Sequence, residues 1–153
     1  MAETLGSLCD KLTIVKLKQW HTEDPTLTSS LEAQAHRLAA EIDDFTRRAL
    51  AGEVPRTELT FAANKVYKRE GNEVAPVSGG IGELFAELAR VNCALWHEQE
   101  KVYEFEKVPA GNKDAVVKQL ALFNLQRNQC IDGIDRSLVA LADAALGGTQ
   151  SRK

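Results

Sequence analysis

Apolar residues recur every three or four positions along most of this 153-residue chain, which is the spacing of one face of an α-helix. The pattern predicts a helix over residues 4–22, which Pro25 prevents from continuing smoothly. It predicts a second helix over 29–51, because Ser29 and the glutamate three positions later fit a capping box and Gly52 is a common stop. The apolar stripes are Leu5, Leu8, Leu12 and Val15 in the first helix, and Leu31, Ala35, Leu38, Ile42, Phe45 and Ala49 in the second.

The second half of the chain repeats this arrangement after a break. A short helix is predicted over 56–68, followed by a loop rich in glycine over 68–80. A long helix is then predicted over 81–107, with Leu84, Leu88, Val91 and Leu95 on one stripe. The last helix is expected to begin after Asn112, a good N-cap, and to end at about Leu146, before Gly147 and Gly148.

These elements predict an all-α fold: an antiparallel four-helix-bundle-like domain of two long helical hairpins, 4–51 and 81–146, joined by a short helix and a loop. Residues 1–148 are expected to form one domain, and 149–153 a frayed tail. The last helix is the longest and is expected to protrude. An exposed apolar stripe on it would need a partner, so we expect a homodimer.

Composition narrows the class of function. The chain has 19 basic and 22 acidic residues, and this net charge of -3 argues against a nucleic-acid partner. It contains no uninterrupted apolar run of spanning length and no signal peptide, so we expect a cytoplasmic protein with no membrane partner. Three scattered cysteines, Cys9, Cys93 and Cys130, are expected to be small core residues in a reducing compartment.

Both tryptophans are followed directly by histidine, as Trp20-His21 and Trp96-His97, although the chain has only two tryptophans and three histidines. Aligning the dipeptides suggests a degenerate internal repeat with one copy per hairpin. In a structural interpretation, each tryptophan closes the core and each histidine meets a helix end or a carboxylate. In a functional interpretation the pairs bind a metal or a small ligand, because a carboxylate lies one turn beyond each histidine. The metal ligands would be His21, Asp24, His97 and Glu100.

A polar layer interrupts the apolar seam of the last helix. We read that seam as Val117, Leu120, Asn124, Arg127, Ile131, Ile134, Leu138, Leu141 and Ala145. A buried Arg127 would need a carboxylate, from Asp10, Glu87 or Asp132, and Asn92 is a candidate polar partner. The layer is either a network that fixes helix register or an anion or phosphate pocket around Arg127. The candidate ligand-binding residues are His21, His97, Arg127, Asn124, Asn128 and Asn92.

Two segments carry a resemblance to a known family. One is Leu12–His21, followed by Glu23 and Asp24, and the other is Asn124–Asn128, followed by two Ile-Asp pairs. Together they are similar to the bacterial domain-of-unknown-function family 4254. The resemblance implies a helical bacterial cytoplasmic protein with no established activity, from a family linked in part with glycosyltransferases of envelope polysaccharide synthesis. The chain has no alternating strands and helices, so it would accompany such an enzyme.

The sequence therefore favours a dimeric interaction, regulatory or accessory protein. The alternative is a small-ligand or metal-dependent enzyme with its site between the two hairpins, formed by His21, His97, Glu100, Asp10 and Arg127. The pattern names no cofactor and no catalytic residue, because it contains no recognisable nucleophile motif.

Overall fold

A computed structural model of the protein describes residues 2–61 and 74–150, with side chains up to residue 148. It contains four α-helices: α1 (Leu5–His21), α2 (Pro25–Leu50), α3 (Ile81–Tyr103) and α4 (Lys113–Gln150). Three short 3-10 turns, Arg56–Glu58, Phe105–Lys107 and Ala110–Asn112, lie outside these helices. The described ranges contain no strand, which confirms the all-α class.

The first hairpin begins and turns at side-chain caps. Thr4 and Ser7 form a capping box at the start of α1, in which each side chain meets the other residue's backbone N–H. Asp24 caps α2 by accepting from the backbone N–H groups of Thr26 and Leu27, with Pro25 at the first helical position. The predicted start at Ser29 is therefore wrong, and the Ser29 hydroxyl instead donates to the Pro25 carbonyl. The helix ends as expected, with Gly52 in the left-handed region at φ 75°.

Two other predicted boundaries move. α3 ends at Tyr103 rather than at 107, because a 3-10 turn follows it. α4 continues through Gly147 and Gly148 to Gln150, so the expected stop at Leu146 is wrong and part of the supposed tail is helical. A glycine costs a helix about 1 kcal/mol, which is too little to end a long helix. Of the helix predicted over 56–68, only Arg56–Glu58 is helical up to residue 61, and 62–68 lie outside the described residues.

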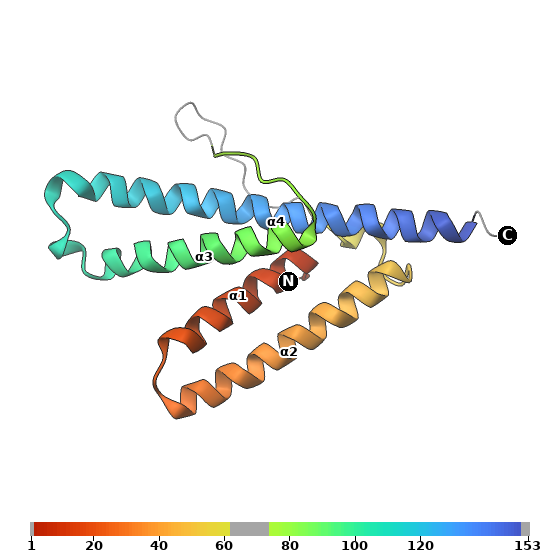
Figure 1. Cartoon of the computed structure of the whole chain (residues 1–153), viewed down its shortest axis with the longest axis horizontal. Helices are drawn as coiled ribbons and strands as arrows, with labels where there is room; N and C mark the ends of the chain where they lie inside the picture. The colour runs from red at the N-terminus through yellow and green to blue at the C-terminus, as the bar shows by residue number, and fades with distance from the viewer. Residues whose placement is uncertain (1, 62–73, 151–153) are drawn as a thin grey trace.

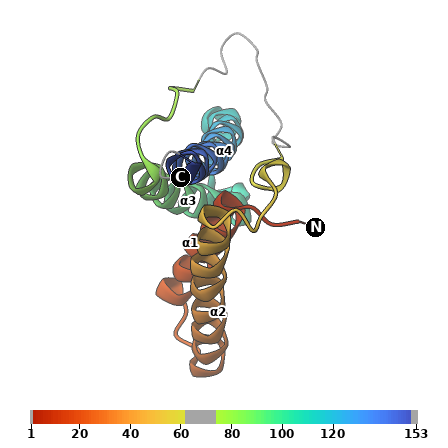
Figure 2. The same cartoon turned by 90° about the vertical axis from the view of Figure 1, so that its right-hand side faces the viewer.

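The helices pair as two hairpins, α1 with α2 and α3 with α4, as predicted. In Figure 1, α3 and α4 run side by side, while the α1–α2 hairpin leaves them at an angle. Figure 2 shows this hairpin projecting from the α3–α4 pair as a separate arm. The outer helix α2 consequently buries only Leu31, Ala35 and Ala49 of its 26 residues.

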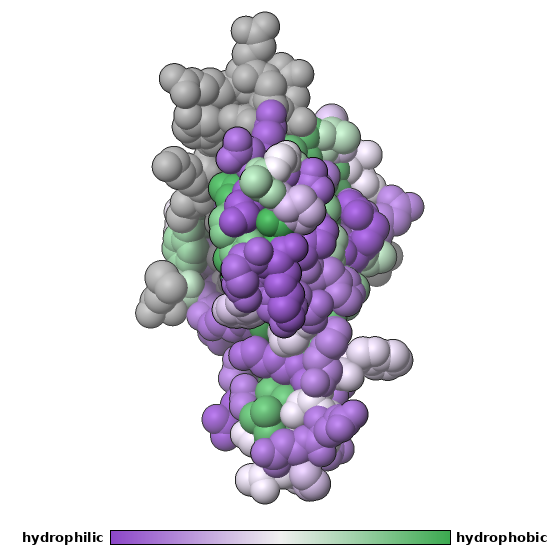
Figure 3. All heavy atoms as spheres, turned by 90° about the vertical axis from the view of Figure 1, so that its left-hand side faces the viewer, coloured by the Kyte–Doolittle hydropathy of each residue, from purple (hydrophilic) through white to green (hydrophobic). Residues whose placement is uncertain are grey.

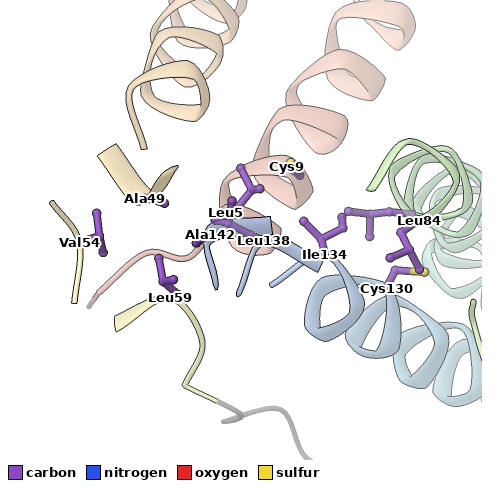
Figure 4. Close-up of a cluster of buried hydrophobic side chains, with 11 residues drawn as sticks. Leu5, Cys9, Ala49, Val54, Leu59, Leu84, Cys130, Ile134, Leu138 and Ala142 are labelled. Carbon is purple, nitrogen blue, oxygen red and sulfur yellow. The ribbon is translucent and has the colours of Figure 1, made fainter. Parts of the chain in front are cut away.

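The main core lies where the two hairpins cross. Figure 4 shows Leu5 and Cys9 of α1 among the buried side chains of α4, with Leu84 of α3 beside them. The α4 residues in this cluster follow each other at intervals of four: Cys130, Ile134, Leu138 and Ala142. The predicted α4 seam is partly wrong, since Val117 and Leu141 are 56% and 51% exposed. A seam with four-residue spacing drifts around a helix relative to one that alternates three and four.

The crossing point requires a glycine. A Cβ atom at Gly6 would lie 2.3 Å from the carbonyl oxygen of Ile131, so only a residue without a side chain lets α1 approach α4 this closely. The Gly6 N–H then donates to the buried Asp135 Oδ1 at 2.7 Å. This carboxylate lies at the positive end of the α1 dipole, where an anion is favoured.

Candidate functional site

An ion pair joins the two hairpins beside this core. Arg127 of α4 donates from Nε to Asp10 Oδ1 at 2.7 Å and from Nη2 to Asp10 Oδ2, a bidentate geometry. The Asp10 side chain is 9% exposed and that of Arg127 is 33% exposed. The hydrogen bond with Asp10 raises the pKa of Arg127 above its ordinary value. Of the three carboxylates that the sequence offered, Asp10 is therefore the partner.

Asn92 of α3 completes a network across three helices. Its Nδ2 donates to Asp10 Oδ1 at 2.9 Å and to Thr13 Oγ1 at 2.7 Å, while the Thr13 hydroxyl donates to the Asp10 carbonyl at 2.7 Å. Asn92 is 1% exposed, and its Oδ1 has no hydrogen-bond partner among the described residues. The predicted link between Arg127 and Asn92 is thus present, with Asp10 between them. Such a network fixes the register of α1 against α3 and α4.

Two candidate ligand-binding residues lie outside this network. Asn124 is exposed, and its amide donates to the carbonyl of Leu120 one turn earlier. Asn128 is half-buried, and it takes no part in the bonds that hold Arg127. The sequence placed Asn124 on the same helical seam as Arg127 and Asn128 on its flank, but neither side chain joins the hydrogen bonds between Arg127 and Asp10.

A pocket of about 430 Å³ opens beside the ion pair, between α1, α2 and α4. We call it the cationic pocket. Its apolar lining consists of Ile14, Val15 and Leu38. Its polar and charged lining comprises Asp10, Lys11, Lys18, Gln34, Arg37 and Arg127. Neither Lys18 nor Arg37 stands out in the sequence, because their proximity depends on how α2 packs against α1.

The ends of α1 and α3 bring the two Trp-His dipeptides together. The His21 ring stacks on the Trp96 ring with centroids 4.7 Å apart, and its centroid lies 5.9 Å from that of His97. Glu100 holds this group from α3: it accepts from Trp96 Nε1 at 2.9 Å and from His97 Nδ1 at 3.4 Å. The expectation that both tryptophans close the core is wrong for Trp20, which is 87% exposed.

The four predicted metal ligands do not form a centre. Asp24 caps α2, His97 pairs with Glu100, and His21 Nδ1 donates to the Leu17 carbonyl at 2.8 Å. Within the described ranges, no group of three or more His, Cys, Asp or Glu side chains is placed to hold a metal ion. The predicted site between the hairpins also divides in two, because Asp10 and His21 are eleven positions apart on α1, about 16 Å along the axis.

A second, apolar pocket of about 420 Å³ lies between α1 and α3. We call it the apolar groove. Trp20 and Leu17 line it from α1, and Phe85 and Ala89 line it from α3. Lys16 is its charged lining residue. Helical spacing places it on roughly the opposite side of α1 from the cationic pocket.

A third pocket, of about 620 Å³, lies at the α3–α4 turn and offers little chemistry. Its lysines are already paired: Lys101 with Glu98 at 2.7 Å and Lys107 with Glu104 at 2.8 Å. Figure 3 views the molecule from the end where both hairpins turn, and hydrophilic side chains dominate this face. The charges of this pocket therefore compensate one another and leave none for a ligand.

Three further titratable groups, Asp135, Cys9 and Cys130, are buried in or beside the core. Burial raises the pKa of Asp135 to about 6, although its bonds with Gly6 and Thr4 oppose the shift. Burial likewise raises the pKa of the Cys9 and Cys130 thiols to about 11, which keeps them neutral and unreactive. All three cysteines are free, and Cys93 is half-buried.

Comparisons of the chain with protein-family models, with curated proteins and with solved structures find no match. The resemblance to family 4254 stays a prediction that rests on the two quoted segments. Within the described residues, no helix combines the length and the apolar character needed to cross a membrane.

Proposed function

We propose that this chain is an interaction protein that binds an amphipathic helix of a protein partner in the apolar groove. The observation that carries the proposal is Trp20, a large aromatic side chain that is 87% exposed at the rim of an almost wholly apolar pocket. Tryptophan is the residue most enriched among the side chains that dominate binding energy at interfaces.

The shape of the groove favours a helix as occupant. Its lining repeats at helical spacing on both walls: Thr13, Leu17 and Trp20 on α1, and Phe85 and Ala89 on α3. Two inclined helices with such faces receive the apolar face of a third helix, whose side chains at i, i+3 and i+4 enter between them. Lys16 at the rim favours an acidic residue on the flank of that helix.

The test compares two exposed aromatic side chains. Trp20→Ala should abolish retention of a protein that the wild-type chain retains from a lysate of its source, with a loss of about 2 kcal/mol or more. Tyr103→Ala is the matched control, because Tyr103 is 78% exposed but lies at the far end of α3. A photo-crosslinking residue at Ala89 should attach to the same protein. Equal retention by both variants would contradict the proposal.

We also propose that two copies associate through the projecting end of α4. Leu141 and Leu146 of α4 are 51% and 43% exposed, and Leu50 at the end of α2 is 37% exposed. The packing of Leu146 next to Gly52 brings these ends together. Light scattering after size exclusion should give twice the chain mass, and Leu141→Glu should halve it. Leu27→Glu, a similarly exposed leucine at the opposite end of α2, should leave the mass unchanged.

The resemblance to family 4254 supplies the first partner class to test. A bacterial glycosyltransferase of envelope polysaccharide synthesis should be the protein that Trp20→Ala loses. The alternative of a metal-dependent enzyme has no supporting cluster of ligands in the described residues, since Asp24 caps α2 and His21 Nδ1 bonds to the Leu17 carbonyl. The small-ligand part of that alternative rests on the cationic pocket beside Arg127 and Asp10.

A further inference from the structure

The cationic pocket concentrates positive charge on a chain whose net charge is -3. Four basic side chains and one carboxylate line it. The carboxylate, Asp10, is already neutralised by Arg127, and Lys11 is paired with Glu3 at 2.5 Å. Lys18 and Arg37 form no ion pair or hydrogen bond with any described residue. Two cations that have no partner among the described residues therefore line the pocket, one from α1 and one from α2.

Arg127 contributes a third set of donors. Its Nε and Nη2 groups bind Asp10, which fixes the plane of the guanidinium, while Nη1 forms no hydrogen bond among the described residues. A guanidinium held on one edge by a buried carboxylate presents its other edge in a defined direction. Because the side chain is one-third exposed, that edge can reach a ligand.

The floor of the pocket is apolar. Ile14, Val15 and Leu38 form it, and Val15 is 6% exposed. Like-charged side chains around an apolar floor are suited to a ligand with an anionic head and an apolar body. The volume of about 430 Å³ lies within the range of small-molecule pockets.

We propose that the cationic pocket binds a small organic phosphate. Lys18 and Arg37 hold the phosphate as charge-assisted donors, and Arg127 orients it through Nη1. The apolar part of the ligand lies on Ile14 and Leu38. This site is independent of the apolar groove, since the two occupy opposite faces of α1.

The experiment titrates the full chain with three probes at low salt. Binding is measured from the shifts of the backbone amide signals in NMR spectra. Phenyl phosphate carries both the anion and the apolar body, inorganic phosphate carries only the anion, and benzyl alcohol only the body. Phenyl phosphate should bind saturably and tightest, with shifts confined to residues 10–18, 34–38 and around Arg127. Molar salt should weaken it.

Three charge-neutralising variants locate the contacts. Lys18→Gln and Arg37→Gln should each weaken phenyl phosphate about tenfold, the effect of losing one hydrogen bond to a charged group. Both residues are exposed, so the fold should survive. Lys16→Gln removes the same charge from the other face of α1 and should leave the affinity unchanged, as should Trp20→Ala.

Three outcomes would overturn the proposal. The first is equal loss from Lys16→Gln and Arg37→Gln, which would indicate a nonspecific charge effect. The second is a shift map outside the pocket, or no saturable binding. The third is inorganic phosphate binding as tightly as phenyl phosphate, which would remove the role of the apolar floor. None of these bears on the groove, and a failure of Trp20→Ala in the partner test leaves the pocket untouched.

Discussion

Removing Arg127 should cost far more stability than removing Asp10, although both changes break the same ion pair. Arg127→Met keeps most of the apolar stem but leaves the Asp10 carboxylate, 9% exposed, with the Asn92 amide as its one remaining donor among the described residues and with no cation bonded to it. Removing one partner of a buried pair typically costs 3–5 kcal/mol. Because Arg127 is itself one-third exposed, we expect about 3 kcal/mol.

Replacing Asp10 instead leaves the Arg127 guanidinium without its carboxylate. Asp10→Asn keeps an oxygen for Asn92 and Arg127, and the guanidinium, one-third exposed, can recover hydration from the cationic pocket. We expect a cost of about 1 to 1.5 kcal/mol, the value of ordinary hydrogen bonds rather than of a stranded charge. The double variant should therefore be more stable than the sum of the two single losses predicts, by about 1–2 kcal/mol.

The free energy of unfolding of wild type, the two single variants and the double variant is measured by urea unfolding at pH 7, with far-UV circular dichroism as the signal. The denaturant slope must stay constant for the free energies of unfolding to be compared. If Arg127→Met cost less than about 0.5 kcal/mol, the pair would behave as an exposed salt bridge. That result would refute the claim that the Asp10 carboxylate depends on Arg127 for its stability in a buried position. Equal costs for the two single variants would refute the asymmetry.

Three further changes test other parts of the structure. Since the folded pKa of Asp135 is about 6 against 3.8 for the free group, its ionisation destabilises the fold as pH rises through that window. Relative to Asp135→Asn, wild type should lose about 3 kcal/mol of unfolding free energy between pH 3.5 and pH 7. Gly6→Ala should lower the melting temperature by several degrees because of its backbone clash, whereas Gly82→Ala, in open space, should stabilise α3 by about 0.5–1 kcal/mol. Iodoacetamide should label Cys93 well before the buried Cys9, as peptide mass mapping would report.

Sequence periodicity was sufficient for the helices and their pairing, because each helix carries its own apolar stripe. It failed where one local signal competed with another. Ser29 and the glutamate after it fit a cap, but Asp24 followed by proline is the stronger start and begins α2 one turn earlier. In α4 the buried residues follow four-residue steps from Cys130. The sequence has apolar residues on several sides of this helix, so the pattern alone did not show which side is buried.

Site residues were predictable when a buried charge demanded a partner. Arg127 on an apolar stripe required a carboxylate, and Asp10 was among the three named. Lys18 and Arg37 gave no such signal, because exposed cations on helices are ordinary. Only the angle at which α2 packs against α1 brings them to one pocket. The repeated Trp-His dipeptide predicted a shared location but not its asymmetry, with Trp96 stacked on His21 and Trp20 free.

The contacts that join the hairpins also bear on how the chain folds during synthesis. Gly6 bonds to Asp135 across 129 positions, and Asp10 to Arg127 across 117. The first hairpin therefore emerges from the ribosome long before the helix that covers its base. Contacts between such distant positions slow folding and prolong the exposure of apolar surface. A nascent chain that stops before residue 127 should thus need a chaperone, whereas the finished chain supplies its own cover.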